Sequence, residues 1–134
     1  MNTSESSTVI VVEDDTQASE AVEALLLSAG YGCRRFISAE ELLAHRLPER
    51  RYCLLLDIHL GGMSGLALQC ELNKRLIKAP VIIVSANDDP AYRQRALEEG
   101  ALAFLRKPYD PDTLLAHVSN AMDVMDRYRT RPCE

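Results

Sequence analysis

The sequence has few residues from which a disulfide framework or a zinc site could be built. Its four cysteines, Cys33, Cys53, Cys70 and Cys133, form no C-x-x-C pair, and its three histidines do not complete a zinc-binding spacing. We therefore expect free thiols in a reducing, cytoplasmic environment rather than a disulfide-bonded secreted domain.

The chain also lacks a long hydrophobic run and an excess of positive charge. No apolar stretch approaches the roughly 18 residues that cross a bilayer, and the N-terminal residues carry no basic segment of a secretory signal. The 15 Lys and Arg residues stand against 20 Asp and Glu residues, which gives a net charge of −5. That balance argues against nucleic-acid binding through the overall field, so we expect neither nucleic acid nor membrane as a direct partner.

The remaining composition is that of one globular domain. The chain has 134 residues, of which 47% are hydrophobic and 26% are charged. No repeat, low-complexity tract or second-domain linker divides it. We expect a disordered lead-in over residues 1–7, one domain over residues 8–127 and a C-terminal tail over residues 128–134.

Short apolar segments alternate five times with helical patterns. The expected strands are 8–12, 32–36, 52–56, 81–84 and 101–105, and the expected helices are 16–29, 38–46, 64–77, 89–99 and 111–125. Arg34 and Arg35 make the second strand the most polar, which favours an edge position. Short connections between alternating strands and helices predict a doubly wound, flavodoxin-like parallel α/β sheet with strand order 2-1-3-4-5.

Two helix starts have recognisable caps. Ser38 and Glu41 fit a capping box, with Ser38 as the N-cap. The fourth helix is expected to begin after Asp88 or Asp89, with Pro90 as its first residue.

Four of the five expected strands end at or just before a residue with a carboxylate, hydroxyl or ammonium group. These residues are Glu13 and Asp14, Asp57, Ser85 and Lys107. In a parallel sheet they share one rim, and clustered carboxylates repel one another unless a cation compensates them. Oxygen ligands without sulfur or imidazole favour a hard cation, and Mg²⁺ fits best. Together with the Lys107 ammonium, this pattern predicts a phosphoryl site on Asp57, a carboxylate that can act as a nucleophile.

These segments resemble the receiver domain of bacterial two-component response regulators over about residues 8–125. The matching segments are Val11–Asp15, Leu55–Asp57, Ser85-Ala86 and Phe104–Pro108. The resemblance implies a phosphoprotein of a phosphorelay, which accepts its phosphoryl group from a sensor histidine kinase or a phosphotransfer protein. It implies a signalling domain that assists its own phosphorylation and dephosphorylation but is not otherwise an enzyme.

The resemblance also implies roles for individual residues. Asp57 would be the phosphoacceptor, Ser85 and Lys107 would contact the phosphoryl oxygens, and Ser85 and Phe104 would form the switch. The Mg²⁺ or Mn²⁺ ligands would be Asp14, Asp57, Glu13 through water, and the backbone carbonyl of His59. His59 and Asn87 would tune the phosphate lifetime. Asp15 is the alternative member of the acidic pair, and the Lys107–Pro108 bond is usually cis in the family.

Three positions depart from the common family pattern. Gly61 stands where many receivers have proline, Ser85 replaces threonine, and Phe104 replaces tyrosine. The Gly61-Gly62 pair predicts a more mobile loop after Asp57. Phosphorylation is expected to repack the surface of the fourth helix, fifth strand and fifth helix, and thereby to control a partner, a homodimer or an output domain.

Two other functions stay open at this point. One is a Mg²⁺-dependent phosphohydrolase with an aspartate nucleophile, although such sites carry a second aspartate where this chain has His59. The other is a receiver-like binding module that is never phosphorylated, against which the intact rim argues. The sequence also leaves open whether the domain acts alone or belongs to a longer regulator.

Overall fold

Five strands and five helices alternate along the chain. The computed structural model describes residues 7–48, 51–87 and 89–130. The elements are β1 (Thr8–Val12), α1 (Thr16–Ser28), β2 (Gly32–Phe36), α2 (Ala39–Leu43), β3 (Tyr52–Asp57), α3 (Gly65–Lys74), β4 (Val81–Ser85), α4 (Pro90–Glu98), β5 (Ala103–Arg106) and α5 (Pro111–Thr130). All neighbouring strands pair in parallel, in the order β2-β1-β3-β4-β5. The predicted fold and the edge position of β2 are confirmed.

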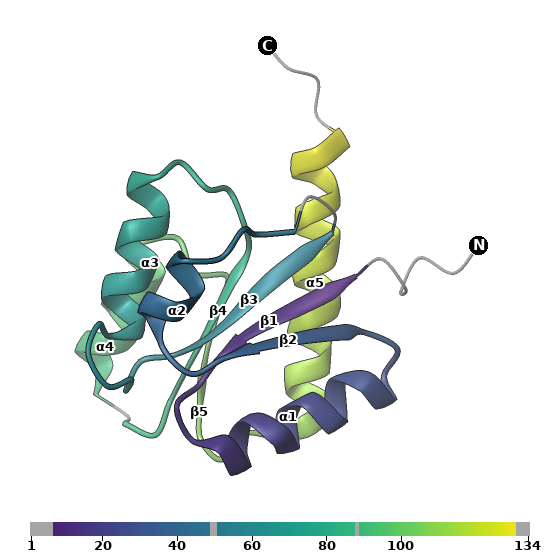
Figure 1. Ribbon diagram of the computed structural model, residues 1–134, viewed down its shortest axis with the longest axis horizontal. Coiled ribbons are helices and arrows are strands. Elements are labelled where there is room, and N and C mark those ends of the chain that lie inside the picture. Colours follow the sequence, from purple (N-terminus) through teal and green to yellow (C-terminus); the bar gives the residue numbers. More distant parts are fainter. Residues whose placement is uncertain (1–6, 49–50, 88, 131–134) are drawn as a thin grey trace.

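The sheet separates two layers of helices (Figure 1). Helices α1 and α5 cover one face, and α2, α3 and α4 cover the other. Alternate side chains of a strand point to opposite faces, so Val9 and Val11 of β1 pack with α1 and α5, while Ile10 and Val12 pack in the opposite core. Both faces of the central strands are therefore buried, which explains why β3 and β4 are almost wholly apolar until their last residue.

Polar side chains fix where most of the helices begin. The Ser38 hydroxyl accepts a hydrogen bond from the Glu41 amide at 3.0 Å, as the capping box predicts. The Glu41 carboxylate accepts from the Ile37 amide at 2.8 Å, one residue before the amide that a regular capping box uses. Asp89 caps α4 by accepting from the Ala91 amide, whereas the alternative cap, Asp88, lies outside the described residues.

Two helices end earlier than predicted. Helix α2 ends at Leu43 rather than near residue 46, and α3 ends at Lys74 rather than at 77. Leu76 has a left-handed φ of 59°, and the Ile77 amide returns to the Leu72 carbonyl, which closes α3 early. After α4, Gly100 has a φ of 98° and the Ala101 amide bonds to the Ala96 carbonyl. Gly100 and Ala101 therefore belong to the close of α4, and β5 begins at Ala103 rather than at residue 101.

The domain extends slightly beyond its expected ends. Ser7 is fully buried and its carbonyl accepts from the Gly32 amide at 2.8 Å, so it belongs to the domain rather than to a lead-in. Helix α5 continues to Thr130, past residue 128 where the tail was expected to start. Residues 1–6 and 131–134, with Cys133, lie outside the described part.

Three of the four cysteines lie within the described residues. Cys33, Cys53 and Cys70 are free, and burial raises the pKa of the Cys53 thiol to about 12. Such a thiol stays protonated and unreactive. None of the described helices has the length and hydropathy that a bilayer span requires.

The two-sided burial of β3 predicts a large stability cost for truncation there. Leu56 is 0% exposed, so Leu56→Ala should lower the free energy of unfolding by about 2–5 kcal/mol. Leu76 is 83% exposed, and Leu76→Ala should change the free energy of unfolding by less than about 0.5 kcal/mol. Urea unfolding of both variants checks this, and equal losses would contradict the described packing.

Candidate functional site

The strand ends meet at one rim, as the parallel register requires. Asp57 pairs with Val84 across β3 and β4, and Ser85 pairs with Arg106 across β4 and β5. Glu13 follows the last residue of β1, and Lys107 follows the last residue of β5. Glu13 and Asp57, which are 94 and 50 residues from Lys107 in the chain, are thereby brought to the Lys107 ammonium group.

Lys107 forms the centre of this rim. Its Nζ donates to Glu13 Oε1 at 2.7 Å and to Asp57 Oδ2 at 2.8 Å. Glu13 is only 7% exposed and Asp57 only 4% exposed. Two buried carboxylates this close require a compensating cation, and a lysine ammonium with three donors can serve both.

The proton equilibria of the cluster reflect burial and charge. Burial is the largest influence on Glu13 and raises the pKa of its carboxyl, as does the neighbouring Asp57, while the Lys107 hydrogen bond opposes the rise. Burial alone would lower the pKa of Lys107, but its hydrogen bonds to Asp57 and Glu13 outweigh burial and raise it. Lys107 therefore stays charged at neutral pH, which its role as counter-ion requires.

Asp14 and Asp15 have different tasks. Asp15 caps α1, and its Oδ1 accepts from the Gln17 amide at 3.0 Å and from the Ala18 amide at 3.3 Å. Asp14 is exposed, and its Oδ2 accepts from the Gly61 amide, in the loop after β3, at 3.3 Å. Asp14, and not Asp15, therefore contacts the loop that follows Asp57.

The donor set fits a hard cation. Asp14 and Asp57 offer carboxylate oxygens that accept from the Gly61 and His59 amides of the loop after β3. Mg²⁺ needs only one or two carboxylates because water and phosphate supply the remaining ligands. Among residues 7–48, 51–87 and 89–130, no group of three or more Asp, Glu, His or Cys side chains is placed so that it could hold a metal ion. Two carboxylates suffice for a partly hydrated Mg²⁺ site, whereas a structural zinc site needs four protein ligands.

Ser85 stands at the end of β4 and is fully buried. Its hydroxyl accepts from the Asn87 amide at 2.9 Å, and its carbonyl accepts from the Lys107 amide at 2.8 Å. The Asn87 side chain is directed to the start of α4, where its Oδ1 accepts from the Asp89 amide at 2.8 Å. Ser85 is thus part of the rim, while the Asn87 side chain is engaged with the helix start.

His59 and Phe104 both contact α4. The His59 amide donates to Asp57 Oδ1 at 2.9 Å, and its exposed ring meets Tyr92 edge-on with 5.7 Å between ring centroids. Phe104 is 7% exposed and packs in the core on the α2–α4 side, with the Arg93 guanidinium 5.1 Å from its ring centroid. His59, which lies next to the Asp57 site, and Phe104 of β5 therefore both touch α4.

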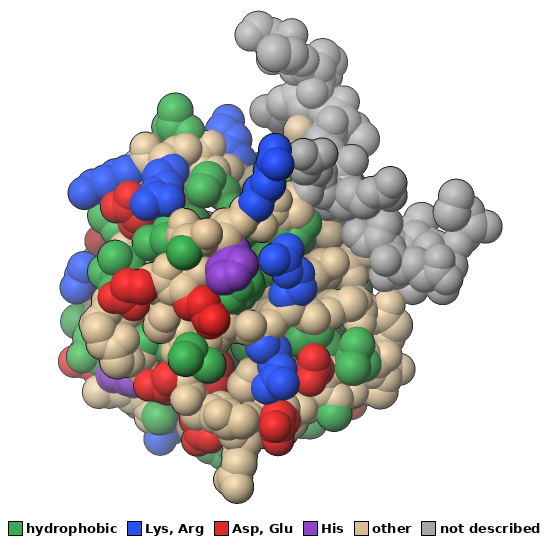
Figure 2. Space-filling view, viewed as in Figure 1, with side chains coloured by type: hydrophobic (Ala, Val, Ile, Leu, Met, Phe, Trp, Pro, Cys, Tyr) green, Lys and Arg blue, Asp and Glu red, His purple; other side chains and the backbone are tan. Residues whose placement is uncertain are grey.

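A cavity of about 660 Å³ adjoins the rim. Residues of α1, the ends of β1, β3 and β4, and the start of α5 form its largely apolar wall. Glu13 and Lys107 also line it. Figure 2 shows Asp and Glu side chains over much of this face, including its lower half, the end toward which β1 and β3 run in Figure 1.

A family comparison agrees with this geometry. Residues 9–119 match the model of the response regulator receiver domain. The chain belongs to the response regulator receiver family. The cis Lys107–Pro108 peptide bond expected for a receiver domain is present.

Curated relatives are longer regulators. Nodulation protein W of Bradyrhizobium diazoefficiens is 38% identical over 121 residues, covering 90% of this chain and 53% of the relative. The DNA-binding transcriptional regulator NtrC of Salmonella typhimurium is 37% identical over 114 residues, covering 85% of this chain and 24% of the relative. The receiver domain thus spans about half, or less, of the curated relatives it matches.

Solved structures show the same fold. The response regulator StyR aligns with a TM-score of 0.87 at 35% identity, covering 92% of this chain and 63% of StyR. A CheY-like receiver domain protein of Methanospirillum hungatei aligns with a TM-score of 0.81 at 25% identity, covering 91% of this chain and 98% of that one.

The structure adds two contacts that the sequence did not indicate. Tyr92 meets the His59 ring, and Glu40 of α2 accepts from the Met63 amide in the loop after β3. Both pairs join elements that are far apart in sequence. No local pattern marks such a pair, although Glu40 lies within the predicted capping segment.

The coupling of Lys107 to Glu13 predicts a pH-dependent loss of stability in Lys107→Met. Without the ammonium, the pKa of the buried Glu13 carboxyl should rise further. A carboxyl with a raised folded pKa destabilises the fold as pH rises through that pKa, because the ionised form is disfavoured when folded. At pH 7 the variant should therefore lose about 1–3 kcal/mol of unfolding free energy.

The difference in unfolding free energy between the wild type and Lys107→Met should shrink as the pH falls through the raised pKa of Glu13 toward its ordinary value of 4.5. Urea unfolding at about pH 7 and about pH 5 measures it, with Lys78→Met at an exposed position as control. A loss that is equal at both pH values would show that Lys107 contributes packing rather than charge compensation.

Proposed function

We propose that this receiver domain is a phosphorylation-operated switch that accepts a phosphoryl group on Asp57. The observation that carries the proposal is the Lys107 ammonium bound to Asp57 and Glu13 at the rim. A buried carboxylate at a strand end, with a cation beside it and a hydroxyl on the neighbouring strand, has the groups that phosphotransfer needs. Receiver domains of this family are signalling domains that histidine kinases phosphorylate, so the donor is a phosphohistidine of a kinase or phosphotransfer protein.

In the transfer, an Asp57 carboxylate oxygen attacks the phosphorus atom. An O–P bond forms, the P–N bond of the phosphohistidine breaks, and its electron pair returns to the imidazole, which takes up a proton. Lys107 can donate to a phosphoryl oxygen because its Nζ already lies 2.8 Å from Asp57 Oδ2. Ser85 keeps its O–H available for the same purpose, because its oxygen accepts and does not donate in the bond to Asn87.

Receiver domains in general bind Mg²⁺, and here Asp14, Asp57 and the His59 carbonyl would hold it, with Glu13 reached through water. Mn²⁺ prefers the same oxygen ligands. The ion supplies positive charge against the transferred phosphoryl group. Glu13 is hydrogen-bonded to Lys107 and so keeps the ammonium beside Asp57.

The added phosphate would act on α4 and β5. Phosphorylation adds about −1.5 to −2 charge at the rim, and Ser85 would move toward it, leaving space that Phe104 can enter. His59 contacts Tyr92 of α4, so a shift of the loop after Asp57 would also be felt by the helix. Exposed His59 and the Asn87 segment would set how readily water reaches the phosphate.

The repacked α4–β5–α5 surface would control a partner, a homodimer or an output domain. The relatives NtrC and nodulation protein W are longer than this chain, which supports an output region elsewhere in the regulator. We place the exchange in the cytoplasm because the described cysteines are free thiols.

Asp57→Asn should abolish phosphorylation. Incubation with acetyl phosphate and Mg²⁺ should add one phosphoryl mass to the wild type and none to Asp57→Asn, because an amide is not a nucleophile for this transfer. Intact-protein mass spectrometry measures it, with Asp110→Asn as a control, since Asn caps α5 as well as Asp does. Equal uptake by Asp57→Asn would refute the assignment, and turnover of a phosphate ester would favour a phosphohydrolase instead.

The two neighbouring aspartates should respond differently to Mg²⁺. Asp14→Asn should weaken Mg²⁺ binding by at least about tenfold, because a charged oxygen ligand is lost. Asp15→Asn should leave the affinity within about twofold, because Asn replaces Asp as a helix cap. A Mg²⁺ titration followed by NMR distinguishes them, and the reverse order of effects would make Asp15 the ligand.

A further inference from the structure

The loop between β3 and α3 is held by three carboxylates from three different elements. Every second amide of the loop donates to one of them. The pairs are His59 to Asp57 Oδ1 at 2.9 Å, Gly61 to Asp14 Oδ2 at 3.3 Å, and Met63 to Glu40 Oε2 at 2.9 Å. These bonds connect the loop, which contains the Gly61-Gly62 pair, to the ends of β3 and β1 and to α2.

Glu40 approaches the loop closely because residue 62 has no side chain. Gly62 has a φ of 79°, and a Cβ built on it would lie 2.9 Å from Glu40 Oε2 and 3.4 Å from Oε1. Any other residue would be strained by this φ and would push the carboxylate away from the Met63 amide. The hydrogen bond between Glu40 and the Met63 amide therefore depends on glycine at position 62.

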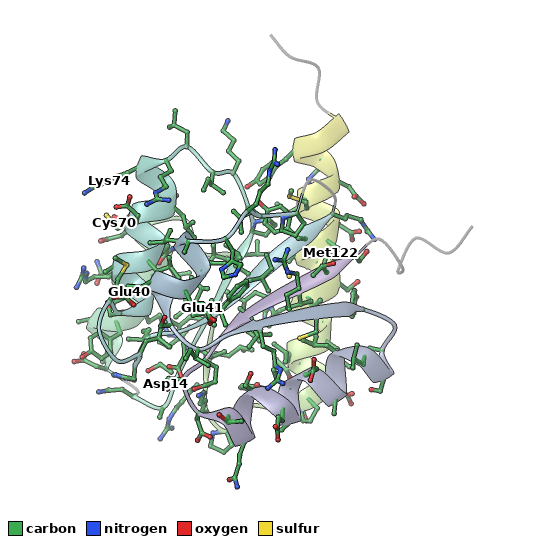
Figure 3. The ribbon with its side chains drawn as sticks, viewed as in Figure 1. Asp14, Glu40, Glu41, Cys70, Lys74 and Met122 are labelled. Carbon is green, nitrogen blue, oxygen red and sulfur yellow. The ribbon has the colours of Figure 1, made fainter. Side chains whose placement is uncertain are left out.

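The backbone of Glu40 is itself firmly placed. Its neighbour Ala39 is 0% exposed and Leu42, in the same short helix, is 1% exposed, so α2 is anchored in the core. Figure 3 shows that Asp14 and Glu40 come from different elements, Asp14 from the end of β1 and Glu40 from α2. The Met63 hydrogen bond lowers the pKa of the Glu40 carboxyl, which keeps it an ionised acceptor at neutral pH.

We propose that Glu40 is a positioning residue that holds the β3–α3 loop in place for metal binding, an inference that rests on the proposed function. Of the three carboxylates on the loop, Asp14 and Asp57 are proposed ligands, so their oxygens must turn toward the ion. Glu40 is outside that ligand set and can keep its bond to Met63 throughout. It thereby fixes the loop backbone to which the His59 carbonyl belongs. Many receivers have a proline at position 61, which would restrict the loop, and here the Glu40 hydrogen bond restricts it instead.

Two substitutions of Glu40 separate position from charge. Glu40→Ala removes the acceptor, whereas Glu40→Gln keeps a carbonyl oxygen that can accept from the Met63 amide but removes the charge. The readouts are hydrogen exchange of the Met63 amide without metal and the Mg²⁺ affinity, both by NMR on the 134-residue chain. Glu40 is exposed, so neither variant is expected to lose the fold.

For Glu40→Ala we expect Met63 exchange about tenfold faster and Mg²⁺ binding about 3- to 10-fold weaker, because the loop loses a charge-assisted bond that solvent partly screens. Phosphorylation at saturating Mg²⁺ should return to the wild-type rate, which general destabilisation would not allow. Glu40→Gln should stay within about threefold of the wild type in both readouts.

Three outcomes would overturn the inference. They are unchanged Met63 exchange in Glu40→Ala, unchanged Mg²⁺ affinity despite faster exchange, and equal weakening of Mg²⁺ binding in both variants, which would mean that Glu40 acts through its charge. The proposed function fails separately, if the wild type itself neither binds Mg²⁺ nor takes up phosphate on Asp57.

Discussion

One ammonium group allows two buried carboxylates to coexist at the end of this sheet. Lys107 lies within 2.8 Å of oxygens from both Glu13 and Asp57, which are almost fully buried. Removing the cation from such a cluster leaves uncompensated charge in a poorly solvated place, which destabilises the fold. The parallel sheet supplies the arrangement, because it delivers the ends of β1, β3 and β5 to one rim whatever their separation in the chain.

The same cluster connects chemistry to the rest of the fold through its neighbours. The loop after Asp57 bonds to Asp14 and Glu40, and its His59 ring touches α4. Helix α4 buries only Ala96 among its residues, so it has fewer core contacts to lose than the central strands when the rim changes charge. His59 links Asp57 to this helix, because its amide donates to Asp57 Oδ1 and its ring meets Tyr92, and the proposed switch would act along these two contacts.

The fold and the core of the site could be predicted from sequence because both depend on local patterns. Asp57, Ser85 and Lys107 each stand at or just after the end of an apolar strand. A parallel sheet places all such strand ends on one rim, so these groups could be expected to meet. The C-terminal end of α3 and the start of β5 could not be placed, because they depend on how Leu76 and Gly100 close helices α3 and α4. Glu40 and Tyr92 were missed because their contacts join distant segments and leave no periodic trace.

Charge compensation by Lys107 can be measured directly in the unphosphorylated domain without metal. NMR of the ¹⁵N-labelled lysine ammonium, with hydrogen-bond couplings to ¹³C-labelled carboxyl groups, reports which carboxylates Lys107 Nζ binds in solution. We expect one slowly exchanging ammonium signal coupled to both Glu13 and Asp57. An ammonium that exchanges as fast as those of exposed lysines, with no coupling to either carboxylate, would contradict the account.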